Sequence, residues 1–184
     1  SRTSLAFNPV TGYPAISYYD ESEKNLRYAV RDDWGWTAST VASSGDVGFY
    51  SSLAFRGNGA PAIAFYDRTN KRLRLAWWRP DVVGGWEFHT VDDAGDVGTG
   101  CSLAPNPHSN DIRISYTYHN TFDTAGSLKI AKITYKSWDL YPAEIPNRYD
   151  LRPVGVDRVL RLEPASASAR RLDWSQPPVL MWQH

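Results

Sequence analysis

The sequence predicts an all-β protein built from repeated four-stranded antiparallel units. Three observations support this prediction. One pattern of about 48–50 residues occurs three times, its apolar runs are short and rich in β-branched and aromatic residues, and Gly, Pro, Asn and Asp separate the runs. A small sheet of this size cannot bury both faces alone, and four strands at this period are typical of a β-propeller blade. We therefore expect three clear blades in residues 1–150, at about 3–50, 51–100 and 101–150.

Four features define the repeat, and they occur in the same order in each copy. A Ser-Leu-Ala anchor begins at Ser4, Ser52 and Ser102. A Leu-basic pair follows at Leu26-Arg27, Leu73-Arg74 and Leu128-Lys129. A tryptophan comes next, at Trp36, Trp86 and Trp138. Copies one and two then end with GDVG at 45–48 and 95–98, where copy three has NRYD.

The first copy shows the expected strands most clearly. Its four runs are Ser4–Phe7, Ala15–Tyr19, Leu26–Val30 and Thr37–Val41. In the third run Leu26, Tyr28 and Val30 share one face of the strand, and Arg27 and Ala29 share the other. None of the three copies has a convincing helical period.

The C-terminal segment, residues 151–184, does not repeat the pattern. It can be a divergent fourth blade, because DRVLRLE and PPVLMWQ could both form strands, or a C-terminal extension. Propellers usually have four to eight blades, so three blades do not close a ring. Two chains could combine into one ring, or the chain could be a fragment of a longer array. We favour a homo-oligomer that completes the ring.

Composition limits the classes of partner. Twenty basic and twenty acidic residues give a formal net charge of zero, which argues against a nucleic-acid binder. No apolar run is long enough to span a bilayer. The single cysteine, Cys101, cannot form a disulfide within the chain. We expect an extracellular or cell-surface location, with a cytoplasmic one as the alternative.

Repeated carboxylates form the first candidate site. Asp20 and Asp67 follow the second strands, and Asp46 and Asp96 lie in the GDVG connections. In a propeller these segments share one face of the disc, where carboxylates could hold a cation or ligand hydroxyls. The alternative is that each aspartate stabilises a turn. Because no calcium-loop spacing occurs, we predict no metal and no cofactor.

The grooves between blades form the second candidate site. Arg27 and Arg74 leave the core face of the third strands, and tryptophans follow them. An indole can stack on the apolar face of a sugar while a guanidinium donates to its hydroxyls. The alternative is that these tryptophans pack between blades. The predicted ligand-binding residues are Tyr19, Asp20, Arg27, Trp34, Trp36, Tyr66, Asp67, Arg74, Trp78 and Trp86.

The blade pattern also resembles known families. The motifs SLAF, PAISYYD, LRYA, WGW and GDVG are similar to blades of bacterial repeat propellers and of propeller lectins of the fucose-binding type. Those lectins place a Glu directly after the Arg, whereas Tyr28 follows Arg27 and Leu75 follows Arg74. The resemblance implies a lectin-like, secreted protein and leaves the sugar open.

We therefore predict a non-enzymatic, carbohydrate-binding propeller with repeated shallow sites between blades. The alternative is a propeller that binds a protein surface or acts as a scaffold, and a glycoside hydrolase is the third hypothesis. Repeated residues do not form the single asymmetric set of side chains that an active site needs. If the lectin hypothesis holds, Trp36 and Trp86 should be partly exposed beside Arg27 and Arg74.

Overall fold

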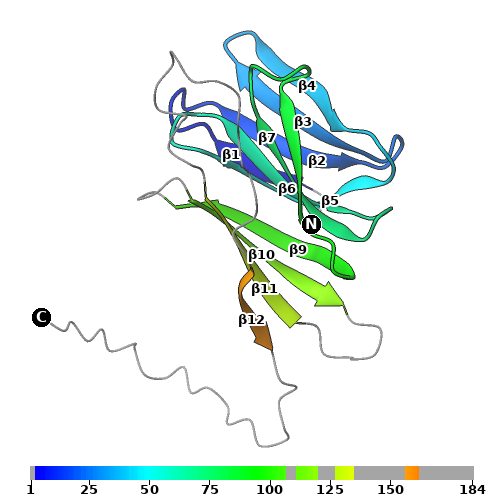
Figure 1. Ribbon diagram of the computed structural model, residues 1–184. Helices are drawn as coiled ribbons and strands as arrows, with labels where there is room; N and C mark the ends of the chain where they lie inside the picture. The colour runs from blue at the N-terminus through cyan, green and yellow to red at the C-terminus, as the bar shows by residue number, and fades with distance from the viewer. Residues whose placement is uncertain (1–2, 107–110, 120–126, 135–155, 162–184) are drawn as a thin grey trace, which may run out of the picture.

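The computed structural model describes residues 3–106, 111–119, 127–134 and 156–161 (Figure 1). These residues form twelve strands in three antiparallel sheets of four strands each. The described residues contain no helix, and therefore none that could cross a membrane. The predicted all-β architecture of four-stranded blades is confirmed.

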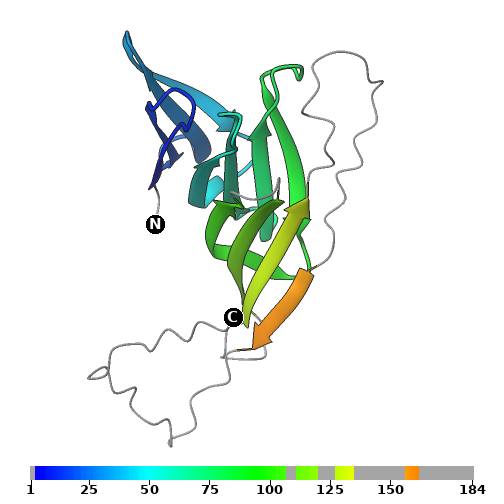
Figure 2. The ribbon, with the colours of Figure 1, turned by 90° about the vertical axis from the view of Figure 1, so that its left-hand side faces the viewer.

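Each sheet is a meander, in which consecutive strands are neighbours. The first sheet contains β1 (Thr3–Phe7), β2 (Pro14–Asp20), β3 (Asn25–Asp32) and β4 (Gly35–Ala42). The second contains β5 (Val47–Phe55), β6 (Pro61–Asp67), β7 (Arg72–Trp78) and β8 (Trp86–Asp92). The third contains β9 (Asp96–Pro105), β10 (Asp111–His119), β11 (Ser127–Thr134) and β12 (Val156–Arg161). Figures 1 and 2 show the three sheets arranged one after another.

The predicted strands of the first copy match β1 to β4 within a few residues at each end. The predicted alternation in β3 is also present, since Leu26 and Tyr28 are buried and Val30 packs against the same cluster. The third sheet takes its outer strand, β12, from the segment that the sequence left open between a fourth blade and an extension. Trp138 and the rest of residues 135–155 and 162–184 lie outside the described residues.

Each blade packs through two different faces, which we name by direction along the chain. The forward face points toward the next blade and the back face points toward the preceding one. The first core joins the forward face of the first blade to the back face of the second. It contains Ala15, Leu26, Tyr28, Val41 and Ala42 from the first blade and Leu53, Phe55, Ile63, Phe65, Ala76 and Trp86 from the second.

The second core repeats this arrangement between the second and third blades. The second blade contributes Ala62, Ala64, Leu73, Leu75, Trp77 and Val91, and the third contributes Cys101, Leu103, Ile112, Ile114, Tyr116, Ala131 and Ile133. The second blade is therefore covered on both faces, which explains why every residue of β6 is buried. Burial of apolar area between sheets is the main favourable term that holds the blades together.

The innermost strands are also joined by a repeated hydrogen bond. The backbone N–H of Leu53 donates to the hydroxyl of Ser4 at 3.0 Å, and the N–H of Leu103 donates to Ser52 at 2.9 Å. The serine of each anchor therefore accepts from the leucine of the next anchor. This contact gives the conserved spacing of the Ser-Leu-Ala motif within this chain a direct structural reason.

The last glycine of GDVG allows each new blade to start close to the previous one. Gly48 has a φ of 108°, and a Cβ there would lie 2.8 Å from the Cα of Leu26. Gly98 has a φ of 106° and the same relation to Leu73, at 2.9 Å. Only glycine adopts this conformation without strain and leaves room for the neighbouring strand.

Candidate functional site

The predicted hairpin carboxylates are engaged in local turns. Asp20 accepts hydrogen bonds from the backbone N–H groups of Ser22 and Glu23 and lies 3.8 Å from the guanidinium of Arg27. Asp67 is fully buried and accepts from Asn70 and from the Nε of Arg72 at 3.0 Å. Burial alone would raise the pKa of Asp67, but these donors together lower it.

The GDVG carboxylates join one blade to the next. Asp46 accepts from the hydroxyl of Tyr19 at 2.9 Å and pairs with Arg68 at 3.5 Å. Asp96 accepts from the hydroxyl of Tyr66 at 2.6 Å. Burial, followed by this hydrogen bond, raises the pKa of Tyr66. The tyrosine and aspartate of each copy therefore meet across the connection, in an arrangement that explains their repetition structurally.

The described residues contain no group of three or more His, Cys, Asp or Glu side chains placed to hold a metal ion. Asp92 is a further buried carboxylate, but it lies between Tyr116 and Lys129 in the contact between the second and third blades. Its role is thus structural.

Both predicted arginines lie on the back faces of their blades. The guanidinium of Arg74 lies over the rings of Phe65 and Phe88, at 5.8 and 5.1 Å from their centroids. Burial, with a smaller effect of Arg72, lowers the pKa of Arg74. The buried Nε atoms of Arg27 and Arg74 make no hydrogen bond in the structure. Arg74 therefore lies inside the contact between blades.

The four predicted tryptophans occupy different environments. Trp86 is 7% exposed and contacts Tyr28 and Trp78 in edge-to-face geometry, with centroids 5.4 Å apart in each pair. Trp36, at the same place in the first copy, is 48% exposed. Trp34 is 96% exposed at the tip of the β3–β4 hairpin, and Trp78 is 37% exposed. Partial exposure, as expected for a lectin site, thus holds for Trp36 and not for Trp86.

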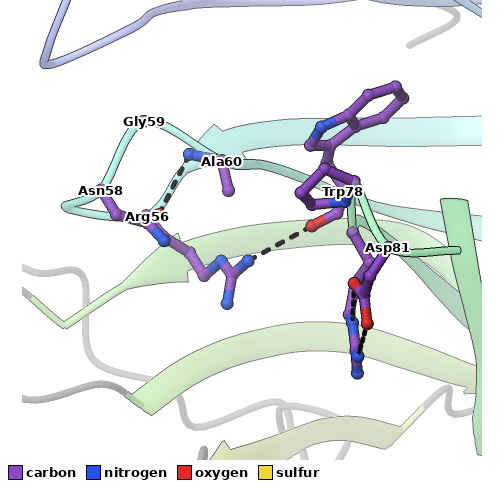
Figure 3. Close-up of a pocket in the computed structure, with 8 residues that line it drawn as sticks. Arg56, Asn58, Gly59, Ala60, Trp78 and Asp81 are labelled. Atoms are coloured by element: carbon purple, nitrogen blue, oxygen red, sulfur yellow. Dashed lines mark hydrogen bonds and ion pairs between the residues drawn. The ribbon is translucent and has the colours of Figure 1, made fainter. Parts of the chain in front are cut away.

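A cavity of about 420 Å³ lies at one end of the second blade (Figure 3). It is formed between the β5–β6 turn and the β7–β8 hairpin, and its lining residues are Arg56, Asn58, Gly59, Ala60, Trp78, Arg79, Pro80 and Asp81. The indole of Trp78 and the guanidinium of Arg56 extend in opposite directions from this gap (Figure 3). Of the predicted ligand-binding residues, only Trp78 lines it.

Two arginines and an acidic side chain supply the charged groups of the cavity lining. Arg56 donates to the carbonyl oxygen of Trp78 at 3.3 Å. Arg79 pairs with Asp81, and its Nη1 lies 3.1 Å from a carboxylate oxygen of Glu87. The hydrogen bond from Arg79 holds the pKa of Asp81 below its usual value. The cavity can therefore offer fixed donors and an ionised acceptor to a polar ligand.

Local backbone features form this cavity. Gly59 and Gly85 both have positive φ, and Asn8 of the first blade donates to the carbonyl oxygen of Gly59 at 3.2 Å. A Cβ at Gly85 would overlap the indole of Trp78, so glycine allows the ring to lie against the hairpin. The first copy has a shorter β3–β4 hairpin and Asn8 in place of Arg56, so this cavity belongs to the second copy.

The predicted ligand-binding residues do not include Arg56, Asn58, Arg79 or Asp81, because these four residues do not recur between the copies. The available signal was the opposite one, a departure from the repeat. The second copy extends its last hairpin to RPDVVGG, whereas the first copy has only RDDWG. Inserted or altered loop residues are where binding sites are usually found on a repeated scaffold.

Comparisons with known proteins assign no family to this chain. No family model matches the chain, and no curated protein matches it. Among solved structures, a fucose lectin from Kordia zhangzhouensis, determined in complex with methyl-fucoside, has a TM-score of 0.48 and 14% sequence identity. The match covers 70% of this chain and 90% of that one.

Proposed function

We propose that the protein binds carbohydrate at the cavity of the second blade. The observation that carries this proposal is that Arg56, Asn58, Trp78, Arg79 and Asp81 together line one gap of about 420 Å³. This volume lies in the range of small-molecule sites. Guanidinium and amide groups donate to hydroxyls, a carboxylate accepts from them, and an indole contacts the apolar face of a sugar ring.

The charge of the lining residues indicates how a glycan would bind. Asp81 is already paired with Arg79, so it presents a fixed acceptor, while Arg56 is anchored through the carbonyl of Trp78. A ligand in the gap would meet the indole on one side and the guanidinium groups on the other. Such fixed polar groups lose little conformational entropy on binding, which favours recognition of hydroxyl-rich ligands.

Trp34 provides a second proposed contact, on the first blade. Its ring is almost fully exposed at a hairpin tip, and its backbone N–H is held by Asp32 at 2.8 Å. The other predicted contacts, including Tyr19, Asp20, Arg27, Tyr66, Asp67 and Arg74, have structural partners that explain them without a ligand. We therefore place the main site in the cavity and treat the protein as a non-enzymatic glycan binder, with an extracellular or cell-surface location as the setting.

A glycan array tests this proposal directly. We expect the wild-type protein to bind a subset of glycans, and we expect Arg56→Ala and Asn58→Ala to reduce binding at least tenfold. Arg31→Ala is the matched control, because it removes an exposed arginine from the β3 position that aligns with Trp78. Circular dichroism would verify that each variant is folded.

Two outcomes would contradict the proposal. A folded wild-type protein that binds no glycan on the array would remove carbohydrate binding altogether. Binding that Arg56→Ala, Asn58→Ala and Trp78→Ala all leave unchanged would place the glycan elsewhere on the molecule.

A further inference from the structure

The back face of the first blade is apolar and has no neighbouring sheet among the described residues. Leu5 is 60% exposed and Phe7 is 64% exposed. The residues at the same anchor positions of the second blade, Leu53 and Phe55, are only 5% and 7% exposed. Exposed apolar patches of this kind on a folded protein mark interaction surfaces.

Strand register shows that these two faces are equivalent. Leu5 pairs with Ile16 in the first blade, and Leu53 pairs with Ile63 in the second. Phe7 likewise pairs with Pro14, and Phe55 pairs with Pro61. Trp36 of the first blade and Trp86 of the second extend the match to the outer strands. The exposed face therefore has the chemistry of a face that already packs against a blade.

The inner-strand hydrogen bonds identify what the missing neighbour must supply. Each covered anchor leucine donates its N–H to the serine of the preceding anchor, as Leu53 does to Ser4 and Leu103 does to Ser52. Continuing this series, Leu5 requires a serine from a preceding blade. Ser102 is the anchor serine of the third blade, and it is exposed. It is therefore the hydrogen-bond acceptor available at the other end of this series.

The forward face of the third blade carries basic residues at positions where the other two blades carry apolar ones, and this difference suits the contact. Arg113 is exposed at the position of Ala15 and Ala62 in the other blades, and Lys132 occupies the position of Val30. In the first core, Ala15 and Val30 belong to the same cluster as Phe55 and Trp86, the residues that match Phe7 and Trp36. Cations placed over exposed aromatic rings interact favourably with them.

We propose that a second copy of this chain covers the back face of the first blade with the forward face of its own third blade. The contact is head-to-tail, and it repeats the two blade contacts already present within the chain. Two copies related by a twofold axis would join two such contacts and close a ring of six blades, within the usual range for propellers. This proposal does not depend on glycan binding.

Light scattering of the purified full chain tests the proposal. We expect a mass of twice the 20.7 kDa of one chain. Phe7→Lys should weaken the dimer at least hundredfold, because the new ammonium is solvated in one chain and lies against Arg113 and Lys132 of the other copy in the dimer. Val83→Lys, on a side chain that is fully exposed in the β7–β8 hairpin, is the matched control and should leave the dimer intact. Ser102→Ala should weaken dimerisation about five- to hundredfold, because it removes one hydrogen bond from each of the two contacts.

Cross-linking tests the direction of the contact. Chains carrying Phe7→Cys and chains carrying Arg113→Cys should form a disulfide only when they are mixed, because a head-to-tail contact brings these two positions together from different copies. A chain that stays monomeric at about 100 μM, a mass other than twice that of the chain, or a dimer that survives Phe7→Lys would overturn the proposal. A cross-link within either unmixed sample would overturn it as well.

Discussion

Asp92 gives the sharpest test of how the blades are held together. It ends β8 and accepts hydrogen bonds from the hydroxyl of Tyr116 at 2.8 Å and the ammonium of Lys129 at 2.9 Å, both from the third blade. Its side chain is 7% exposed and that of Lys129 is 12% exposed. In the first blade Ala42 occupies the corresponding register position, so this ion pair belongs to the second contact alone.

Asp92→Asn should lower the free energy of unfolding by about 3 kcal/mol. Removal of one partner from a buried ion pair costs about 3–5 kcal/mol, because the other charge stays buried without compensation. We expect the lower end of this range, since asparagine keeps an oxygen that can accept from Tyr116 or from the N–H of Ala94. In urea, with a slope of about 2 kcal/mol/M, the midpoint should fall by about 1.5 M.

The pH dependence should follow from the same contacts. Burial alone would raise the pKa of Asp92, but the donors from Ala94, Lys129 and Tyr116 together lower it in the folded state. A lowered folded pKa contributes stability above the unfolded value of about 3.9, and that stability is lost as the pH falls through the folded value. The difference between wild type and Asp92→Asn should therefore be constant near neutral pH and shrink in acid.

Two controls define when this reasoning fails. Asp93→Asn, on the exposed neighbouring residue, should change the free energy of unfolding by less than about 0.5 kcal/mol. Lys129→Met should recover part of the loss in the Asp92→Asn background, because it removes the unpaired ammonium. A change below about 0.5 kcal/mol in Asp92→Asn, or strictly additive effects in the double-mutant cycle, would show that the pair does not couple the blades.

Three further predictions follow from burial and backbone geometry. Trp86→Ala should reduce the free energy of unfolding, measured in urea, by about 3–5 kcal/mol, because Trp86 is buried. Trp34→Ala should change it by less than about 0.5 kcal/mol, because Trp34 is exposed. Equal effects would contradict the assignment of Trp86 to the core. Gly48→Ala should lower the free energy of unfolding by at least about 2 kcal/mol, because Gly48 has a positive φ and a close neighbour. Gly57→Ala should leave it nearly unchanged, because Gly57 has open space around it and an ordinary φ. Similar losses in the two variants would refute this explanation. Burial raises the pKa of the Cys101 thiol to about 12. A thiol reagent at pH 8 should therefore react with Cys101 only after the chain unfolds. Rapid reaction of the native chain would contradict this prediction.

The blade architecture could be predicted because patterns within short stretches of sequence indicate it. Alternation in β3 and the turn residues around it are properties of a single strand and its ends, and the repeat supplied independent copies of each. The hydrogen bond between Ser4 and Leu53 could not be read in this way, since it joins residues 49 positions apart. Only the folded structure, in which the two blades lie side by side, brings these two residues into contact.

The candidate site was harder to predict because recurrence has two possible causes. Trp36 and Trp86 recur in register, and either packing or binding would preserve that register. Their exposures differ, and among the described residues a sheet precedes the blade of Trp86 but not that of Trp36. The cavity residues Arg56 and Asp81 carried no repeat signal, and their proximity depends on how two hairpins fold at one end of the second blade.

The position of the second blade has a consequence for the order in which the structure opens. It is the one blade covered on both faces by described sheets, whereas each flanking blade has one such neighbour. In a linear array stabilised by nearest-neighbour contacts, the ends open more readily than the middle. In a single chain that is not closed into a ring, amide protons of β6 should therefore exchange most slowly and those of β1 earlier, so that the most stable of the three blades lies between the other two.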